Sequence, residues 1–144
     1  MREVKVGWMK DAVLAAHIEV GPHHLRADEP EESGGADTAP SPHQILLSSL
    51  GACTSLTLRL YARRKGWPLT DAIVQLTGHQ QDGRYIISRQ VHLEGALDVD
   101  QRARLMEIAD KCPVHRTLSG EIAINSTENR ELAGGLAGTE ISEA

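Results

Sequence analysis

Aromatic residues are scarce in this chain of 144 residues, making up 3% of it, and phenylalanine is absent. Acidic residues outnumber basic ones by 20 to 15, which gives a formal net charge of -5. A nucleic-acid-binding surface needs basic side chains for the phosphates and, for single strands, aromatic rings on which bases stack. The composition therefore argues against a nucleic-acid partner.

Long apolar runs and cysteines are also few. No run approaches the roughly 18 uncharged residues of a membrane span, and residues 1–5 lack the apolar core of a secretory signal. The only cysteines are Cys53 and Cys112, too few for a secreted disulfide scaffold. We expect a one-domain cytoplasmic protein without a membrane span, in which any disulfide is transient.

The N-terminal third predicts a meander of strands. Apolar and polar residues alternate over residues 2–9, with Val4, Val6 and Trp8 on one face, which indicates a half-buried strand. Further strands are expected around residues 12–20 and 25–27, each after a turn. Residues 28–40 are rich in Asp, Glu, Pro, Gly and Ser and predict a long polar loop, either disordered or functional.

A long helix is expected next. Ser41 followed by Pro42 and Gln44 forms a capping box with proline at the first helical position. No charge occurs in the fourteen positions before Arg59, so we expect a helix buried all round. Several of its residues are small, which allows another element to approach closely.

The second half predicts a hairpin, a helix and a last strand. Residues 72–78 and 84–94 are rich in β-branched residues, with an Asp-Gly turn signal between them. Asp98 caps a second helix that Cys112-Pro113 interrupts. A helical turn should follow Pro113, and a strand is expected around residues 122–124. The order βββ–α–ββ–α–β predicts an α+β domain over residues 1–126, with residues 127–144 as a tail.

The two cysteines permit two interpretations. Unpaired cysteines are commonly small buried hydrophobes. Alternatively, one thiolate attacks the O–O bond of a hydroperoxide, becomes a sulfenic acid and condenses with the other thiol. The separation of 59 positions between Cys53 and Cys112 does not decide between these roles.

Cys112 is expected to be the N-cap of a short helix that begins at Pro113. The unpaired backbone N–H groups there favour its thiolate. Cys112 and His115 also have the spacing of half a zinc site, so a zinc protein using Cys53, Cys112, His115 and His43 remains an alternative.

Cys53 lies about three turns inside its helix, beyond the reach of the helix dipole. A reactive Cys53 therefore needs a cation from elsewhere, and Arg26 and Lys10 are the candidates because Arg59 points away along the helix. His43, at the start of the helix, could orient the site, although ten helical residues span about 15 Å.

Several short motifs resemble those of a known family. They are Asp28-Glu29-Pro30, Gly34-Gly35, Ser41-Pro42, the segment 46–54 around Cys53, and Asp110-Lys111-Cys112-Pro113-Val114-His115. Together they resemble the OsmC/Ohr family of thiol peroxidases over roughly residues 5–126. The resemblance implies an OsmC-like fold and an intertwined homodimer whose two sites lie at the subunit interface.

The resemblance also implies a mechanism. Cys53 would reduce an organic hydroperoxide to the alcohol in oxidative-stress defence, Cys112 would close a disulfide, and a small dithiol or other thiol would reopen it. No metal, haem or flavin is implied. His43 stands where family peroxidases commonly carry a glutamate, and Arg26 or Lys10 would supply their arginine. The alternative is a non-enzymatic dimeric OsmC-like redox sensor or small-ligand-binding protein in which Cys53 is inert.

Overall fold

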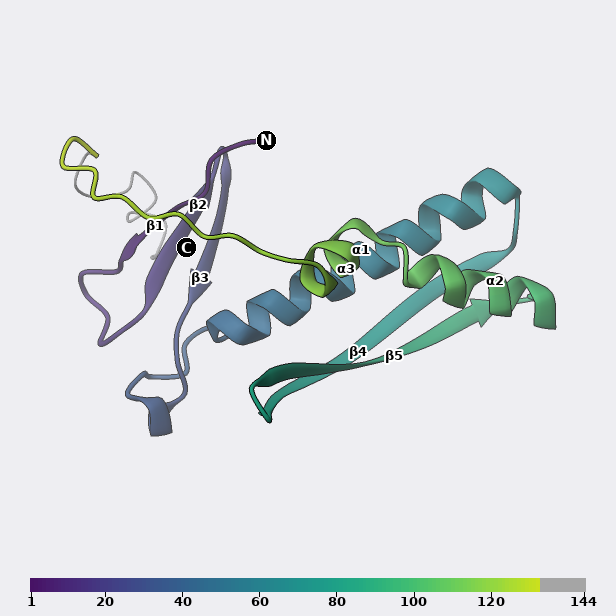
Figure 1. Ribbon diagram of the computed structural model, residues 1–144, viewed down its shortest axis with the longest axis horizontal. Helices are drawn as coiled ribbons and strands as arrows, with labels where there is room; N and C mark the ends of the chain where they lie inside the picture. The colour runs from purple at the N-terminus through teal and green to yellow at the C-terminus, as the bar shows by residue number, and fades with distance from the viewer. Residues whose placement is uncertain (133–144) are drawn as a thin grey trace. The chain divides into compact units, whose positions relative to one another are not determined.

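The computed structural model describes residues 1–132, which divide into two compact units (Figure 1). Among the described residues, one unit contains residues 1–45 and 125–132, and the other contains residues 46–124. The fold is mixed α and β, as predicted. Most of the predicted tail, residues 127–144, lies outside the described residues.

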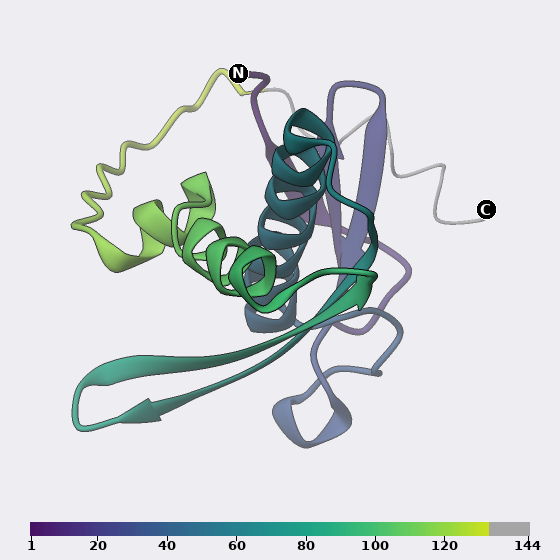
Figure 2. The same ribbon diagram turned by 90° about the vertical axis from the view of Figure 1, so that its right-hand side faces the viewer.

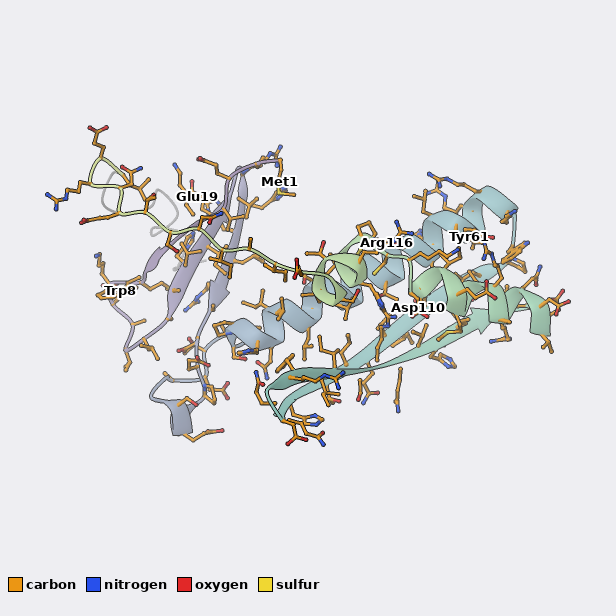
Figure 3. The ribbon with its side chains drawn as sticks, viewed as in Figure 1. Met1, Trp8, Glu19, Tyr61, Asp110 and Arg116 are labelled. Atoms are coloured by element: carbon orange, nitrogen blue, oxygen red, sulfur yellow. The ribbon has the colours of Figure 1, made fainter. Side chains whose placement is uncertain are left out.

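The N-terminal unit contains a three-stranded antiparallel sheet in the order β1-β2-β3. Its strands are β1 (Lys5–Trp8), β2 (Ala16–Val20) and β3 (His23–Ala27), so the predicted meander is confirmed with shorter strands. The prediction that the first strand is half-buried is wrong for the described residues, because Val6 is 60% exposed and Trp8, which Figure 3 labels, is 79% exposed. An alternating pattern identifies the strand but does not show that anything covers its apolar side.

The segment between β3 and the first long helix is an ordered loop built around Asp28. It contains one turn of 3-10 helix, η1 (Glu31–Ser33). The buried Asp28 carboxylate accepts hydrogen bonds from the Thr38 hydroxyl at 2.6 Å, the Thr38 backbone N–H at 2.9 Å and the Glu29 backbone N–H at 2.8 Å. These bonds, that of the Thr38 hydroxyl foremost, lower the pKa of Asp28 to about 2 because they favour the ionised carboxyl.

Helix α1 (Pro42–Lys65) begins at the predicted capping box. The Gln44 N–H donates to Ser41 Oγ at 3.2 Å, and the Ser41 N–H donates to Gln44 Oε1 at 2.9 Å. The helix ends at Gly66, whose φ of 70° is the left-handed conformation that glycine adopts easily.

Helix α1 is buried along one face rather than all round, which corrects the prediction. Its buried positions recur at intervals of three or four, and they are Leu50, Gly51, Thr54, Leu58 and Ala62. On another face Leu56 is 65% and Leu60 is 48% exposed. By length and composition α1 is also the one helix among residues 1–132 that could cross a membrane, a test that the core helices of soluble proteins pass as well.

Two long strands and two short helices complete the second unit. The strands β4 (Leu69–Gln81) and β5 (Arg84–Gly95) form the predicted hairpin. Asp82 and Gly83 connect them with φ angles of 51° and 76°, the positive values that a tight hairpin turn requires. Helix α2 (Val99–Ala109) begins at the predicted Asp98 capping box, and α3 (Pro113–Ser119) is the predicted turn after Pro113.

The core of this unit lies where α1, α2 and the hairpin meet (Figures 1 and 2). Ser55 Oγ donates to the Ala72 carbonyl of β4 at 3.0 Å, and a Cβ on Gly51 would lie 2.8 Å from Leu76 Cδ1. The expected close approach at small residues is therefore confirmed. The buried residues of this core are Leu58, Ala62, Leu93, Leu105, Ile108 and Ala109.

The strand expected around residues 122–124 is absent. Residues 121–129 have no regular secondary structure, and Ile122 is 57% and Ile124 is 84% exposed. A strand is stabilised by hydrogen bonds to a neighbour, and among residues 1–132 neither sheet pairs with this segment. Two isoleucines at alternate positions do not compensate for the missing partner strand.

Candidate active site

Cys112 occupies the junction between α2 and α3. It is fully buried and adopts the extended conformation of an N-cap, with φ -64° and ψ 145°. Its Sγ accepts a hydrogen bond from the His115 backbone N–H at 3.4 Å. The predicted N-cap is thus confirmed, and Pro113 fits the first helical position because no hydrogen bond to its missing N–H is required there.

Thr54 brings the two cysteine motifs together within the second unit. It follows Cys53 on α1, is fully buried, and its Oγ1 lies 3.7 Å from Cys112 Sγ. The Thr54 hydroxyl donates to the Leu50 carbonyl at 2.7 Å, so in the thiol state it is Cys112 that donates to Thr54 Oγ1. Residues 58 positions apart in sequence therefore meet beside the helical turn that carries Cys53.

Arg89 of β5 joins this cluster, and the sequence analysis missed it. Its side chain is 12% exposed. It donates to Thr54 Oγ1 at 3.0 Å, to Asp110 Oδ1 at 2.8 Å and to His115 Nδ1 at 3.1 Å. Because arginine only donates, His115 Nδ1 must be an unprotonated acceptor, which leaves the proton of the neutral ring on Nε2.

The signal for Arg89 was present in the strand pattern. Ile87, Arg89, Val91 and Leu93 alternate with exposed residues, so they share the inward face of β5. A charged residue at an inward position of a strand requires hydrogen-bond or ion-pair partners. Asp110 and His115 provide them from the junction of α2 and α3, where Figure 3 marks Asp110.

Cys53 lies on a different face of α1 from Thr54. It is half-buried and is separated by seven residues from both Leu46 and Leu60, which places all three along one line of the helix. Leu46, Leu60 and the adjacent Leu56 are exposed. We call these three leucines the apolar stripe of α1. Both cysteines are free thiols, and Cys53 is the more accessible of the two.

The other predicted site residues belong to the N-terminal unit. Arg26 is exposed on β3, opposite His17 of β2; Lys10 is exposed in the loop after β1; and His43 is exposed on the first turn of α1. Their roles at Cys53 stay predictions.

The histidines differ in part from the expectation that most are solvated. His17 is 1% exposed, and its Nε2 lies 3.0 Å from Nδ1 of His24. Within residues 1–132 no group of three or more His, Cys, Asp or Glu side chains is arranged to hold a metal ion.

Solved structures similar to this chain share its fold. An OsmC-like protein from Mycoplasma pneumoniae is 19% identical, with a TM-score of 0.71 over 83% of this chain and 88% of that one. An organic hydroperoxide resistance protein OsmC from Legionella pneumophila is 18% identical, with a TM-score of 0.62 over 83% of this chain and 90% of that one. The organic hydroperoxide resistance protein OhrB of Bacillus subtilis is 19% identical, with a TM-score of 0.58 over 83% and 91%.

No curated protein matches the chain. The sequence model of the OsmC-like protein family, however, matches residues 34–127, which include both cysteines and the whole Arg89 cluster. The match covers more than half of the chain. The chain belongs to the OsmC-like protein family.

Proposed function

We propose that this protein is a thiol-dependent peroxidase that reduces organic hydroperoxides, with Cys53 as the peroxidatic and Cys112 as the resolving cysteine. The observation that carries the proposal is the contact of Cys112 with Thr54, the residue next to Cys53. Family membership and the hydroperoxide resistance named for the Legionella and Bacillus proteins support a role in stress defence.

The reaction balances in two steps. The Cys53 thiolate attacks the O–O bond, which leaves a sulfenic acid on Cys53 and an alkoxide that takes up a proton to become the alcohol. The Cys112 thiol then attacks the sulfenic sulfur, forming the disulfide and releasing water. A small dithiol or another thiol reduces the disulfide, which suits the reducing conditions of the cytoplasm.

The different exposure of the two cysteines supports the proposed assignment of their roles. Cys53 is half-buried, whereas Cys112 is fully buried, and its sulfur contacts the His115 N–H and Thr54 Oγ1. A hydroperoxide reaches the accessible sulfur first. The buried thiol is protected from the substrate and reacts only with a sulfur presented by its own protein.

The apolar stripe of α1 supports the homodimer. Leu56 and Leu60 are 65% and 48% exposed on the helix that also carries Cys53, and grouped exposed apolar side chains are typical of a surface that a partner covers. In the proposed intertwined dimer a second copy covers the stripe beside Cys53. Arg26, or alternatively Lys10, is the cation proposed to activate Cys53, and His43 takes the place of the family glutamate.

Single-turnover oxidation tests the function. Pre-reduced protein is mixed with cumene hydroperoxide or hydrogen peroxide, and peroxide loss and intact mass are followed. We expect a rapid loss of two mass units, faster with the organic peroxide. Cys53→Ser should be inert, while Cys112→Ser, which retains a good N-cap, should stop at the sulfenic acid.

A negative result would be equally clear. Thiols that survive excess peroxide for many minutes would refute the peroxidase and favour the non-enzymatic sensor or ligand-binding protein. Reaction in Cys53→Ser at the wild-type rate would refute the assignment of roles. Hydrogen peroxide consumed faster than cumene hydroperoxide would refute the organic substrate class.

A further inference from the structure

We propose that Arg89 is the positioning residue of the resolving cysteine: it holds Cys112 against α1 for attack on oxidised Cys53. The proposal rests on the proposed function and concerns only its second step. Arg89 touches neither sulfur in a described contact; it acts through Thr54 and through the residues on either side of Cys112.

The hydrogen-bond partners of Arg89 include residues on both sides of Cys112 in the sequence. Asp110 and His115, which accept from Nη2 at 2.8 Å and 3.1 Å, lie two residues before and three residues after Cys112. Nη1 donates at 3.0 Å to Thr54, which lies next to Cys53 on α1. One guanidinium group of β5 therefore ties the connection between α2 and α3 to the turn of α1 that carries the peroxidatic cysteine.

The cluster fixes the orientation of Thr54 Oγ1 as well. This oxygen donates to the Leu50 carbonyl and accepts from Arg89 and from Cys112, which uses its one proton and both lone pairs. A threonine hydroxyl that makes all three of its hydrogen bonds is held in one orientation. The position of Cys112 Sγ is therefore defined by Thr54 on one side and by the His115 N–H on the other.

An arginine is required by this geometry. Its planar fork donates from two nitrogens in different directions, whereas a lysine ammonium is a compact charge at the end of a flexible stem. A lysine at position 89 could keep the ion pair with Asp110 but could not hold Thr54 and His115 at the same time. Methionine would fill similar space and hold none of them.

The affected step is closure of the disulfide. Attack by Cys112 on the Cys53 sulfenic acid forms the S–S bond, breaks the S–O bond and joins the leaving hydroxide to the thiol proton as water. Displacement of a reacting group by about 1 Å costs about 100-fold in rate. We expect closure in Arg89→Met to be roughly 10- to 100-fold slower than in the wild-type protein, with sulfenic acid formation on Cys53 changed by less than about threefold.

The experiment separates these two steps. Rapid mixing with cumene hydroperoxide at several concentrations gives the bimolecular rate of sulfenic acid formation and the peroxide-independent rate of closure, with dimedone trapping the intermediate for mass analysis. Arg89→Lys should lie between the wild-type protein and Arg89→Met, and it is the variant to use if Arg89→Met does not fold.

Arg102→Met is the matched control. Arg102 also makes two hydrogen bonds in this unit, to the Leu93 and Gly95 carbonyls at 3.0 Å and 3.2 Å, but contacts none of the cysteine cluster. The Arg102→Met variant measures how far the loss of two hydrogen bonds elsewhere in the unit slows disulfide closure. Slowed closure and accumulated sulfenic acid in the Arg89 variants but not in Arg102→Met would support the proposal.

Equal effects of the Arg89 and Arg102 variants on closure, or normal closure in Arg89→Met, would overturn it. A second oxidant makes the test independent of the peroxidase reaction. Diamide accepts two electrons and two protons from a pair of thiols and leaves a disulfide, so closure can be timed without a hydroperoxide. Failure with peroxide but Arg89-dependent closure with diamide would refute the proposed function alone, whereas no closure with either reagent would refute the positioning.

Discussion

Gly51 tests how closely α1 packs on the hairpin. A Cβ at this position would lie 2.8 Å from Leu76 Cδ1, the flexible tip of a half-buried side chain. Alanine gains about 1 kcal/mol over glycine inside a helix, while pushing a side chain off its rotamer costs about 0.5–1.5 kcal/mol. The free energy of unfolding of Gly51→Ala should therefore stay within about 1 kcal/mol of the wild-type value.

Gly51→Val should behave differently, because its additional methyl groups extend toward β4 and valine is a poorer helix former. Overpacking of this kind costs about 1–3 kcal/mol. Urea unfolding of both variants, alone and combined with Leu76→Ala, measures the coupling between the two positions. If Gly51→Ala costs as much as Gly51→Val and Leu76→Ala rescues neither, the contact with Leu76 does not limit the approach and this reasoning is wrong.

Three further substitutions test the core and the loop. Leu58→Ala, at a fully buried position, should lower the free energy of unfolding by about 2–5 kcal/mol in urea titrations, and a loss under 1 kcal/mol would mean that the site collapses or is wet. The free energy of unfolding of the wild-type protein should fall as pH drops from about 4 to about 2, because the folded pKa of Asp28 is about 2 and its ordinary value is 3.8. Asp28→Asn should not show this fall. Identical pH curves for the two proteins would contradict the assignment of the fall to Asp28. Gly35→Ala should destabilise by about 2 kcal/mol or more because the new Cβ would overlap the Glu29 carbonyl, and unchanged protease resistance of the loop would argue otherwise.

What could be predicted from the sequence is local. The caps at Ser41, Asp98 and Cys112 and the Asp82-Gly83 turn depend on residues at most a few positions apart, so their patterns specify their geometry. The hairpin and the helices α1 and α2 follow from the same kind of signal. The cysteine motifs were found because each lies at such a local feature or matches a family pattern.

What could not be predicted depends on contacts distant in sequence. Arg89 meets Thr54 across 35 positions and Asp110 across 21, and only the inward face of β5 hinted at it. The exposed Trp8 and the missing strand near Ile124 have the same origin, since a pattern records an apolar face but not the surface that covers it. The sequence therefore identified the thiols and missed the cation that organises their surroundings.

The two cysteines of the proposed site lie toward different faces of α1. Thr54 faces Cys112 inside the unit, whereas Cys53 shares its line of the helix with exposed leucines. Covering one such half-exposed leucine stabilises an interface by about 1–1.5 kcal/mol, and a two-fold dimer counts each position twice. Leu56→Asp places a carboxylate in the proposed interface and should convert the proposed dimer into monomers, measured by light scattering on a sizing column at several concentrations.

Leu56→Ala is the matched control for this substitution. It removes less apolar surface and introduces no charge, so it should weaken the dimer without abolishing it. Because Leu56 is 65% exposed in the single chain, neither change should disturb the fold of the unit, which circular dichroism can verify. If Leu56→Asp leaves the mass of the particle unchanged, the apolar stripe is not a dimer interface. If the substitution produces monomers in which Cys53 keeps its full reactivity, the interface does not contribute to the peroxidatic site.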